Sequence, residues 1–300
     1  MRQLKLIVSV LLCCVPITMS AQQLTTLRES IEAGLRAEQG TFAVAFEDLS
    51  SGDQLLIREK EMFHAASTMK TPVMIEVLAQ AREGLFSIDD SLLVLNEFKS
   101  IVDGSPYQLD LSDDSDDSMY KRIGGKCTIR ELLFQMITVS SNLATNVLID
   151  LVDAKNVTRT MRMLGASDIQ VLRGVEDDKA FQKGLNNQTT ALDLLIVLRA
   201  IARGTAVDNA ACRLMLEILH AQKFRDIIPA QLPADVRVAH KTGSITGVEH
   251  DSGIVVLPDG RRYVLVVLSK GLKDAEAGKK ALARVSRQIY DFMMQSSNAR

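Results

Sequence analysis

Strand-like segments lie at both ends of this 300-residue chain, and helical patterns fill the middle. Two early segments, TFAVAFEDLS and QLLIREK, meet at the turn residues 50–53, and this pattern predicts a β-hairpin. Three late segments follow, VRVAHKTG, SGIVVL and RRYVLVVLS, and the last two flank the turn Pro258-Asp259-Gly260. Because strand edges need partners, we expect the early and late strands to join in one antiparallel sheet.

The helical segments divide into a terminal pair and a middle group. Three of them open with a capping pattern, namely Thr26 with Glu29, Thr128 with Glu131, and Thr190 with Asp193. A last helix is predicted from about 273 to 294 because its apolar residues share one face. The sequence therefore predicts an α/β (α+β) fold, a five-stranded antiparallel sheet flanked by terminal helices plus an inserted all-helical lobe. The α/β lobe would comprise 22–66 and 221–300, the helical lobe 67–220, and a cleft between them would be the natural ligand site.

The first 21 residues have the layout of a cleavable secretory signal. Arg2 and Lys5 precede the apolar run LIVSVLLCCVPI, and small residues follow at Ser20 and Ala21. The run is shorter than the roughly 20 residues that a membrane-spanning helix needs. We therefore expect a periplasmic or secreted protein with no membrane span after signal removal.

Composition and motifs argue against several classes of function. The formal net charge of -2 lacks the basic excess that is typical of nucleic-acid partners. The four histidines show no metal-ligand spacing, and neither a P-loop nor a dinucleotide fingerprint is present, so no metal or other cofactor is expected. Signal removal would leave Cys127 and Cys212, which we interpret as two buried thiols, although export would permit a disulfide.

A polar, acidic segment, VDGSPYQLDLSDDSDDSMYKRIGGK, separates two helical regions at about residues 100–126. A loop of this length is either a lid over a site or a solvated connection. Its charge favours the solvated interpretation.

Three short motifs carry the candidate chemistry. In the first, Ser67 precedes Lys70 by three residues, so the two share a helix face near its N-terminus, where the dipole favours developing negative charge. Apolar neighbours would desolvate Lys70 and lower its pKa, which can make it a base. A Ser-x-x-Lys pair arises about once by chance in 300 residues, but Ser140-Ser141-Asn142 and Lys241-Thr242-Gly243 follow it in order.

With these three motifs the chain resembles the class A β-lactamases, within the wider group of serine penicillin-recognising enzymes. The likeness extends over most of the mature chain, and AASTMK, ITVSSNLATNVLI and HKTGS are the segments most like the family. It implies a monomer that acts on β-lactams through a serine acyl-enzyme.

The resemblance also implies roles for the motif residues. Ser67 would attack the lactam carbonyl, Lys70 would help remove its proton, and Ser140 would protonate the departing nitrogen. The backbone N–H groups of Ser67 and of Ser244, which follows Gly243, would hold the oxyanion. The remaining motif residues would bind substrate, Asn142 its side-chain amide, and Lys241 and Thr242 its carboxylate.

Deacylation is where the sequence departs from the family pattern, Glu-x-x-Leu-Asn. Glu176 lies near the family's usual distance beyond Ser140 and is our choice for the deacylation base. Ala180 stands where the family places a water-positioning Asn, so Asn186 or Asn187 would have to serve by another path of the loop.

Two other departures concern charge. Ser141 replaces the family's usual Asp, and no Arg follows the Lys-Thr-Gly triplet on the next strand, which leaves Arg225 or Arg237 as candidate partners for a substrate carboxylate. The alternatives to a β-lactamase are a peptidoglycan DD-peptidase or related serine acyl hydrolase, which needs no Glu176, and a penicillin-binding sensor that stays acylated.

Overall fold

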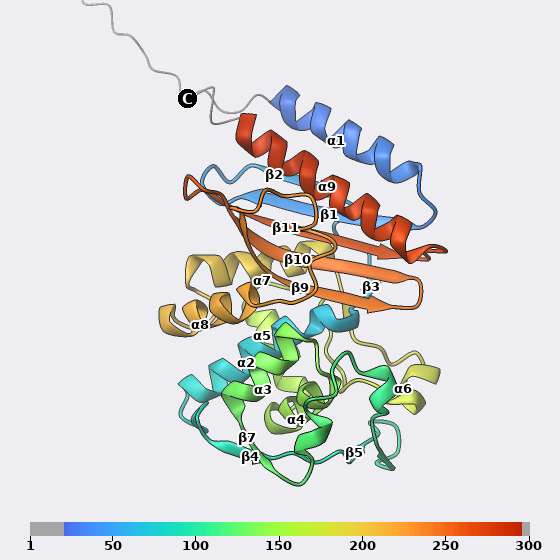
Figure 1. Cartoon of the computed structure of the whole chain (residues 1–300), viewed down its shortest axis with the longest axis vertical. Coiled ribbons are helices and arrows are strands. Elements are labelled where there is room, and N and C mark those ends of the chain that lie inside the picture. The colour runs from blue at the N-terminus through green and yellow to red at the C-terminus, as the bar shows by residue number, and fades with distance from the viewer. Residues whose placement is uncertain (1–20, 296–300) are drawn as a thin grey trace, which may run out of the picture.

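The computed structural model describes residues 21–295 (Figure 1). The predicted signal peptide lies outside these residues except for Ala21. The helices are α1 (Ala21–Arg36), α2 (Lys70–Arg82), α3 (Ile129–Thr138), α4 (Asn142–Val152), α5 (Ala154–Met163), α6 (Asp178–Gln182), α7 (Ala191–Arg203), α8 (Asn209–His220) and α9 (Ala275–Gln295), with 3-10 turns η1 (Ala66–Met69), η2 (Leu111–Asp113) and η3 (Tyr120–Arg122). The strands are β1 (Thr41–Asp48), β2 (Gln54–Ile57), β3 (Phe63–His64), β4 (Ser91–Leu93), β5 (Phe98–Lys99), β6 (Pro106–Tyr107), β7 (Lys126–Thr128), β8 (Gln188–Thr189), β9 (Arg237–Ile245), β10 (Val248–Val256) and β11 (Arg262–Lys270).

The central sheet joins the early and late strands, as predicted. Its order is β2-β1-β11-β10-β9, and every neighbouring pair is antiparallel. The first strand, β1, pairs with the last, β11, so the two ends of the chain are tied together in the middle of the sheet. Strand β9 is left at the edge of this sheet, and it carries the Lys-Thr-Gly triplet.

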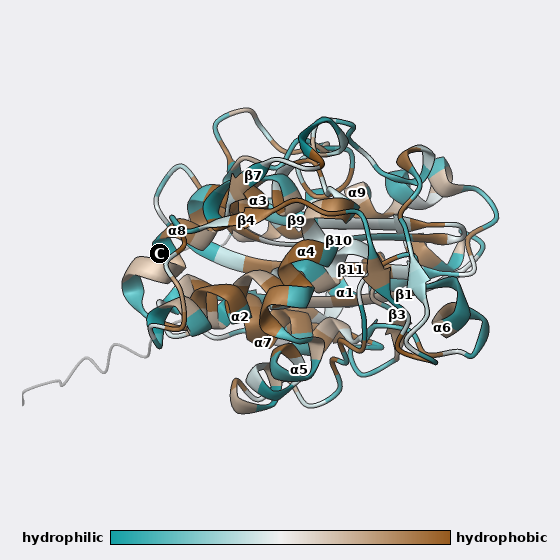
Figure 2. Cartoon of the chain, turned by 90° about the horizontal axis from the view of Figure 1, so that it is seen from below, coloured by the Kyte–Doolittle hydropathy of each residue, from teal (hydrophilic) through white to brown (hydrophobic). Residues whose placement is uncertain are grey.

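The two faces of the sheet are covered by different helices (Figure 1). Helices α1 and α9 pack on one face around an apolar cluster that includes Phe46, Tyr263 and Ile289. The other face contacts α7, and a second cluster continues from there through α2, α3 and α4, whose apolar residues dominate the view from below (Figure 2). The five-stranded sheet with flanking terminal helices and the helical region inserted between its strands is therefore confirmed, while the proposed lobe boundaries stay a prediction.

Local capping patterns had mixed success as predictors of helix starts. Thr128 and Glu131 form a reciprocal capping box at the start of α3, and the Thr190 side chain accepts a hydrogen bond at the start of α7, as predicted. The prediction at Thr26 is wrong because α1 already begins at Ala21, and Thr26 instead donates its hydroxyl to the Gln22 carbonyl inside the helix.

Two further sequence expectations can be compared with this structure. Cys127 and Cys212 are both buried and are not bonded to each other, which confirms the interpretation as two buried thiols. Within residues 21–295, none of the helices has the length and apolar character needed to cross a membrane.

Candidate active site

The first motif lies where the chain leaves β3 and enters α2. Ser67 is the second residue of η1, and Lys70 is the first residue of α2. The His64 ring accepts a hydrogen bond from the Ala66 backbone N–H over 3.0 Å, and Ala66 has a positive φ of 44°. This turn brings Ser67 to a cavity wall while it directs Lys70 into the protein, where its side chain is fully buried.

The ammonium group of Lys70 contacts the second motif. Nζ donates to the Ser140 carbonyl over 2.6 Å, to Ser140 Oγ over 3.2 Å and to Asn142 Oδ1 over 2.8 Å. Burial lowers the pKa of Lys70 to about 7, and the nearby carboxylates Asp114 and Glu176 partly oppose that effect. Among the hydrogen bonds of the described residues, Lys70 makes none to Ser67, so the predicted pair are near in sequence but not directly bonded.

Ser140 lies between two buried lysines. Lys241 Nζ, from the third motif, donates to Ser140 Oγ over 3.0 Å and to the Thr242 carbonyl over 2.9 Å. Lys241 is fully buried, and burial, together with the positive charge of Lys70, lowers its pKa well below the usual range. A hydroxyl held between two amines can pass a proton in either direction.

Gly243 allows the edge strand β9 to pass directly beside η1. A Cβ at this position would lie 3.1 Å from the backbone nitrogens of Ser67 and Thr68. This close approach places Ser244 next to the start of η1, and both Ser67 and Ser244 line the same cavities. The Ser244 hydroxyl donates to Glu249 Oε1 over 2.9 Å, which orients this end of the strand.

Glu176 reaches the site from the irregular segment before α6. Its Oε1 accepts a hydrogen bond from Asn142 Nδ2 over 2.7 Å, and its Oε2 accepts from the Asp110 N–H over 3.2 Å. Burial raises the pKa of the Glu176 carboxyl, which is half-buried. Asn142 therefore bridges the two titratable groups, since its oxygen accepts from Lys70 and its amide donates to Glu176.

The segment that carries Glu176 is fixed on both sides. Before it, the Asn146 side chain on α4 accepts from the Val175 N–H over 2.7 Å and donates to the Val175 carbonyl over 3.1 Å. After it, the buried Asp177 carboxylate accepts from the Ser100 hydroxyl and the Ile101 N–H, each over 2.9 Å. Glu176 lies between these anchors with a positive φ of 61°.

The two asparagines considered for water positioning are committed elsewhere. Asn187 Oδ1 accepts from the backbone of Leu172 and Arg173, and its Nδ2 donates to the Arg173 carbonyl. Asn186 Oδ1 accepts from the Arg173 guanidinium over 3.1 Å. Both amides hold the loop itself, although Asn187 also lines the cavity beside Ser67.

Two cavities meet at Ser67. The larger, of about 600 Å³, is lined by Ser67, Asn142, Glu176 and Ser244, and the smaller, of about 230 Å³, adds Ser140 and Thr242. The cation that lines the smaller cavity is Lys279, which pairs with Asp226 over 2.9 Å. Arg225 and Arg237, the candidates for a substrate carboxylate, line neither of these two cavities.

Most residues of the 100–126 loop are exposed, as its composition favoured, but a short part of the loop also reaches the site. Asp113 and Ser115 line the larger cavity beside Ser67, and Asp114 binds the N-terminus of α4. Sequence reasoning missed both Asp114 and Asn146. Asn146 lies four residues after Asn142 on α4, so helix spacing could have indicated it.

The chain belongs to the β-lactamase enzyme family, whose pattern matches residues 26–293. A β-lactamase of Bacteroides uniformis is 24% identical over 94% of this chain and 96% of its own length. The solved β-lactamase of Sphaerobacter thermophilus is 26% identical, with a TM-score of 0.75 over 92% of this chain and 97% of that one. A substituted form of PBP-A, solved as an acyl-enzyme complex with penicillin G, is 26% identical, with a TM-score of 0.78 over 91% and 97% of the two chains. These matches confirm the resemblance to class A β-lactamases that the three motifs indicated.

Proposed function

We propose that this protein is a serine β-lactamase that hydrolyses the β-lactam amide through an acyl-enzyme on Ser67. The observation that carries the proposal is one chain of hydrogen bonds. It runs from Lys241 through Ser140, Lys70 and Asn142 to Glu176. A buried amine near neutral pKa at one side of Ser67 and a half-buried carboxylate at the other match the two proton transfers that the reaction needs.

In the acylation step, Lys70 in its neutral form takes the Ser67 hydroxyl proton as Oγ bonds to the lactam carbonyl carbon. The oxyanion is stabilised by the N–H groups of Ser67 and Ser244, which Gly243 allows to lie close together. The C–N bond then breaks, and the nitrogen receives a proton from Ser140, which regains one from Lys70 or Lys241.

In the deacylation step, Glu176 takes a proton from a water molecule as the water oxygen bonds to the ester carbon. The ester bond to Ser67 Oγ breaks, and Oγ receives the proton that Glu176 took from the water, which returns Ser67 and Glu176 to their starting protonation states. Asn142 holds the Glu176 carboxylate and presents the same amide to a substrate. Thr242, which lines the smaller cavity, and the buried Lys241 behind it bind the substrate carboxylate.

The wider setting follows from the chain as a whole. The family, the N-terminal signal pattern and the net charge of -2 support a periplasmic or secreted monomer whose partner is a small β-lactam rather than a nucleic acid.

The test is an intact-mass time course of the mature protein with benzylpenicillin. We expect an adduct on Ser67 that appears and then clears while the drug is consumed. A persistent adduct would contradict the hydrolase and favour a non-turnover penicillin-binding protein.

A DD-peptidase is the second candidate because Glu176 lacks one expected partner. Ala180 is buried where the family pattern has an asparagine, and Asn186 and Asn187 are used by the loop. The similarity to PBP-A, solved with penicillin G as an acyl-enzyme, fits the same candidate. Release of D-alanine from a D-alanyl-D-alanine peptide, together with a stable penicillin adduct, would favour it.

A further inference from the structure

The N-terminus of α4 is capped by a carboxylate from a distant part of the chain. Asp114, in the 100–126 loop, accepts the Asn142 N–H over 3.0 Å and 2.9 Å with its two oxygens. Its Oδ2 also accepts the Leu143 N–H over 3.1 Å. Helix N-termini favour negative charge, so these bonds fix both the loop and the first turn of the helix.

The residue that Asp114 holds is the one that connects the two titratable groups of the site. The Asn142 side chain contacts both Lys70 and Glu176, and a shift of its backbone would change both contacts. We propose that Asp114 is a positioning residue for acylation, in which the loop supplies a carboxylate that orients Asn142 and, through it, Lys70. This inference rests on the proposed function only for its effect on the reaction, because the position and charge of Lys70 can be measured without a substrate.

The second motif explains why a carboxylate has to come from elsewhere. Its middle residue, Asp in the family pattern, is Ser141 in this chain. Ser141 is fully buried, its Oγ accepts the Ala144 N–H over 3.3 Å, and the same oxygen lies 3.4 Å from Asp114. The missing negative charge is therefore replaced, a few ångströms away, by a residue that is 27 positions earlier in the chain.

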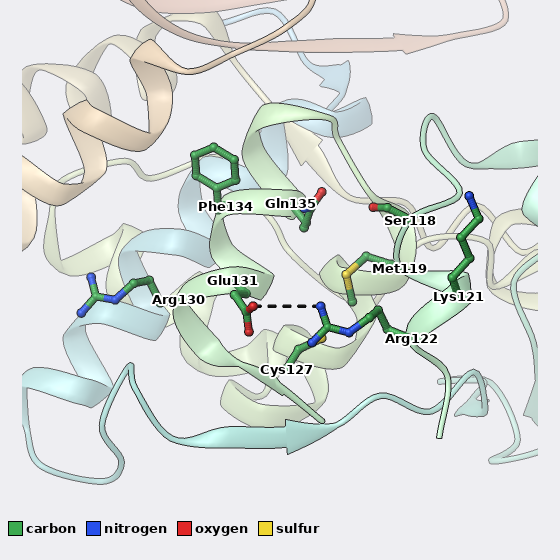
Figure 3. A pocket seen from close by; sticks show the side chains of 9 residues that line it. All are labelled: Ser118, Met119, Lys121, Arg122, Cys127, Arg130, Glu131, Phe134 and Gln135. Carbon is green, nitrogen blue, oxygen red and sulfur yellow. Dashed lines mark ion pairs between the residues drawn. The ribbon is translucent and has the colours of Figure 1, made fainter. Parts of the chain in front are cut away.

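The loop is anchored on both sides of Asp114, so it can hold the carboxylate in place. Before it, Ser100 and Ile101 bind Asp177, as described above. After it, Met119 is buried and forms part of the wall of a cavity of about 540 Å³ between the loop and α3 (Figure 3). An ion pair between Arg122 and Glu131 spans this cavity at 4.0 Å and ties the loop to the helix.

The charges that face Lys70 come from three separate elements. Asp114 from the loop and Glu176 from the segment before α6 favour the charged amine, while Lys241 on β9 is the neighbouring cation whose own pKa the charge of Lys70 lowers. Burial has the largest effect and lowers the pKa of Lys70. Removal of the Asp114 charge should therefore lower that pKa further, because one of the two opposing carboxylates is lost.

The first test measures Lys70 directly, by NMR titration of protein labelled with ¹³C at the lysine side chains. The Lys70 signal is assigned by its loss in Lys70→Arg. In Asp114→Asn we expect Lys70 to titrate at lower pH than in the wild type, whereas Asp117→Asn should leave it unchanged. Asp117→Asn is a matched control because it removes the same charge from the same loop, at an exposed side chain that forms an ion pair with Lys121. Equal Lys70 titrations in the two variants would overturn the proposal whether or not the protein hydrolyses β-lactams.

The second test measures the acylation rate constant with benzylpenicillin. Displacement of a reacting group by about 1 Å lowers a reaction rate by roughly 10²-fold, so Asp114→Asn should slow acylation by about 10- to 100-fold. The acidic limb of the pH–rate profile should also shift to lower pH. If Asp114 had only a structural role, Asp114→Asn would lower the melting temperature and the acylation rate but would not shift the pH profile of acylation.

The third test moves the carboxylate back into the motif. In the wild-type background, Ser141→Asp would place a buried carboxylate in contact with Asp114 and should destabilise the protein. In the Asp114→Asn background, the same change should restore at least a third of the lost acylation activity on a logarithmic scale, because Asp is a good N-cap for α4. If Asp114→Asn does not fold, the double variant still decides, since the proposal requires it to fold better than either single variant. The proposal would be contradicted if the two substitutions were each harmful and their effects on stability and acylation simply added in the double variant.

Discussion

The two sides of the candidate site are built in different ways. Ser67, Lys70, Ser140 and Lys241 lie at helix ends and on the edge strand, and the last three of these side chains are buried. Glu176 lies in a segment without regular structure and is held by neighbouring loops and by Asn142.

In the proposed mechanism, this difference separates the two half-reactions. The acylation side depends on the packing of η1 against β9 and on the buried lysines, which belong to the core of the fold. The deacylation side depends on side-chain contacts between irregular segments, which can change without loss of the fold. Family members could therefore keep acylation while they gain or lose turnover, and mutations should be able to affect each half separately.

Ser67→Ala should have the largest effect. Loss of the nucleophile removes the covalent step, and a fall of about 10⁶-fold in turnover is expected for a residue of this kind. Intact mass spectrometry should detect no adduct with any β-lactam. A stable adduct in this variant would mean that another residue is the nucleophile.

Lys70→Met should come next. The methionine fills a similar volume but cannot accept the Ser67 proton, so the acylation rate constant should fall by about 10²- to 10⁴-fold. Lys179→Met is the control, since Lys179 is an exposed lysine on α6 that pairs with Asp103. Acylation at the wild-type rate in Lys70→Met would exclude Lys70 as the base.

A matched pair of glycine variants tests whether the two sides of the site can be affected separately. In Gly243→Ala the new Cβ would crowd the nitrogens of Ser67 and Thr68 at 3.1 Å, so formation of the adduct should slow by about 10-fold.

In Gly174→Ala the new Cβ would lie 2.5 Å from Asn146 Oδ1, the atom that holds Val175. Adduct formation should be nearly unchanged, while its clearance should slow by about 10-fold. Stopped-flow acylation and mass-detected clearance measure both rates for both variants. Equal effects of each variant on both rates would mean that the two sides are not separable.

The smallest effect is the change in acylation rate between pH 8 and pH 7. Because burial lowers the pKa of Lys70 to about 7, the amine is mostly neutral at pH 8 and about half protonated at pH 7. The acylation rate constant should fall by about two-fold between these values and then more steeply, approaching tenfold per unit below about pH 6. A flat profile between pH 5 and pH 8 would be inconsistent with a neutral lysine base.

The sequence predicted the acylation side better than the deacylation side for a physical reason. Ser67 with Lys70, and Lys241 with Thr242 and Gly243, are contiguous motifs on regular elements, so local spacing already determines most of their geometry. The alternating strands likewise predicted the sheet, since its period is local.

Asp114 could not be found in this way. The contacts of Asp114 with Asn142 and Leu143 depend on the path of a loop that has no periodic pattern. The acidic composition of that loop predicted exposure to solvent rather than a contact with α4. The sequence did single out Asn187, but as a candidate for positioning water. It did not predict that this side chain holds the backbone of Leu172 and Arg173. Side-chain contacts between irregular segments are set by tertiary structure, and sequence spacing does not encode them.

Acylation and deacylation are proposed to use different residues, and Glu176→Gln is the variant that separates the two steps. Rapid-quench mass spectrometry with benzylpenicillin gives both rate constants from one sample. The account predicts an acylation rate constant within about three-fold of the wild type and a deacylation rate constant lower by about 10²- to 10⁴-fold, so that the Ser67 adduct accumulates. Clearance of the adduct at the wild-type rate, or an equal loss in both steps, would contradict it.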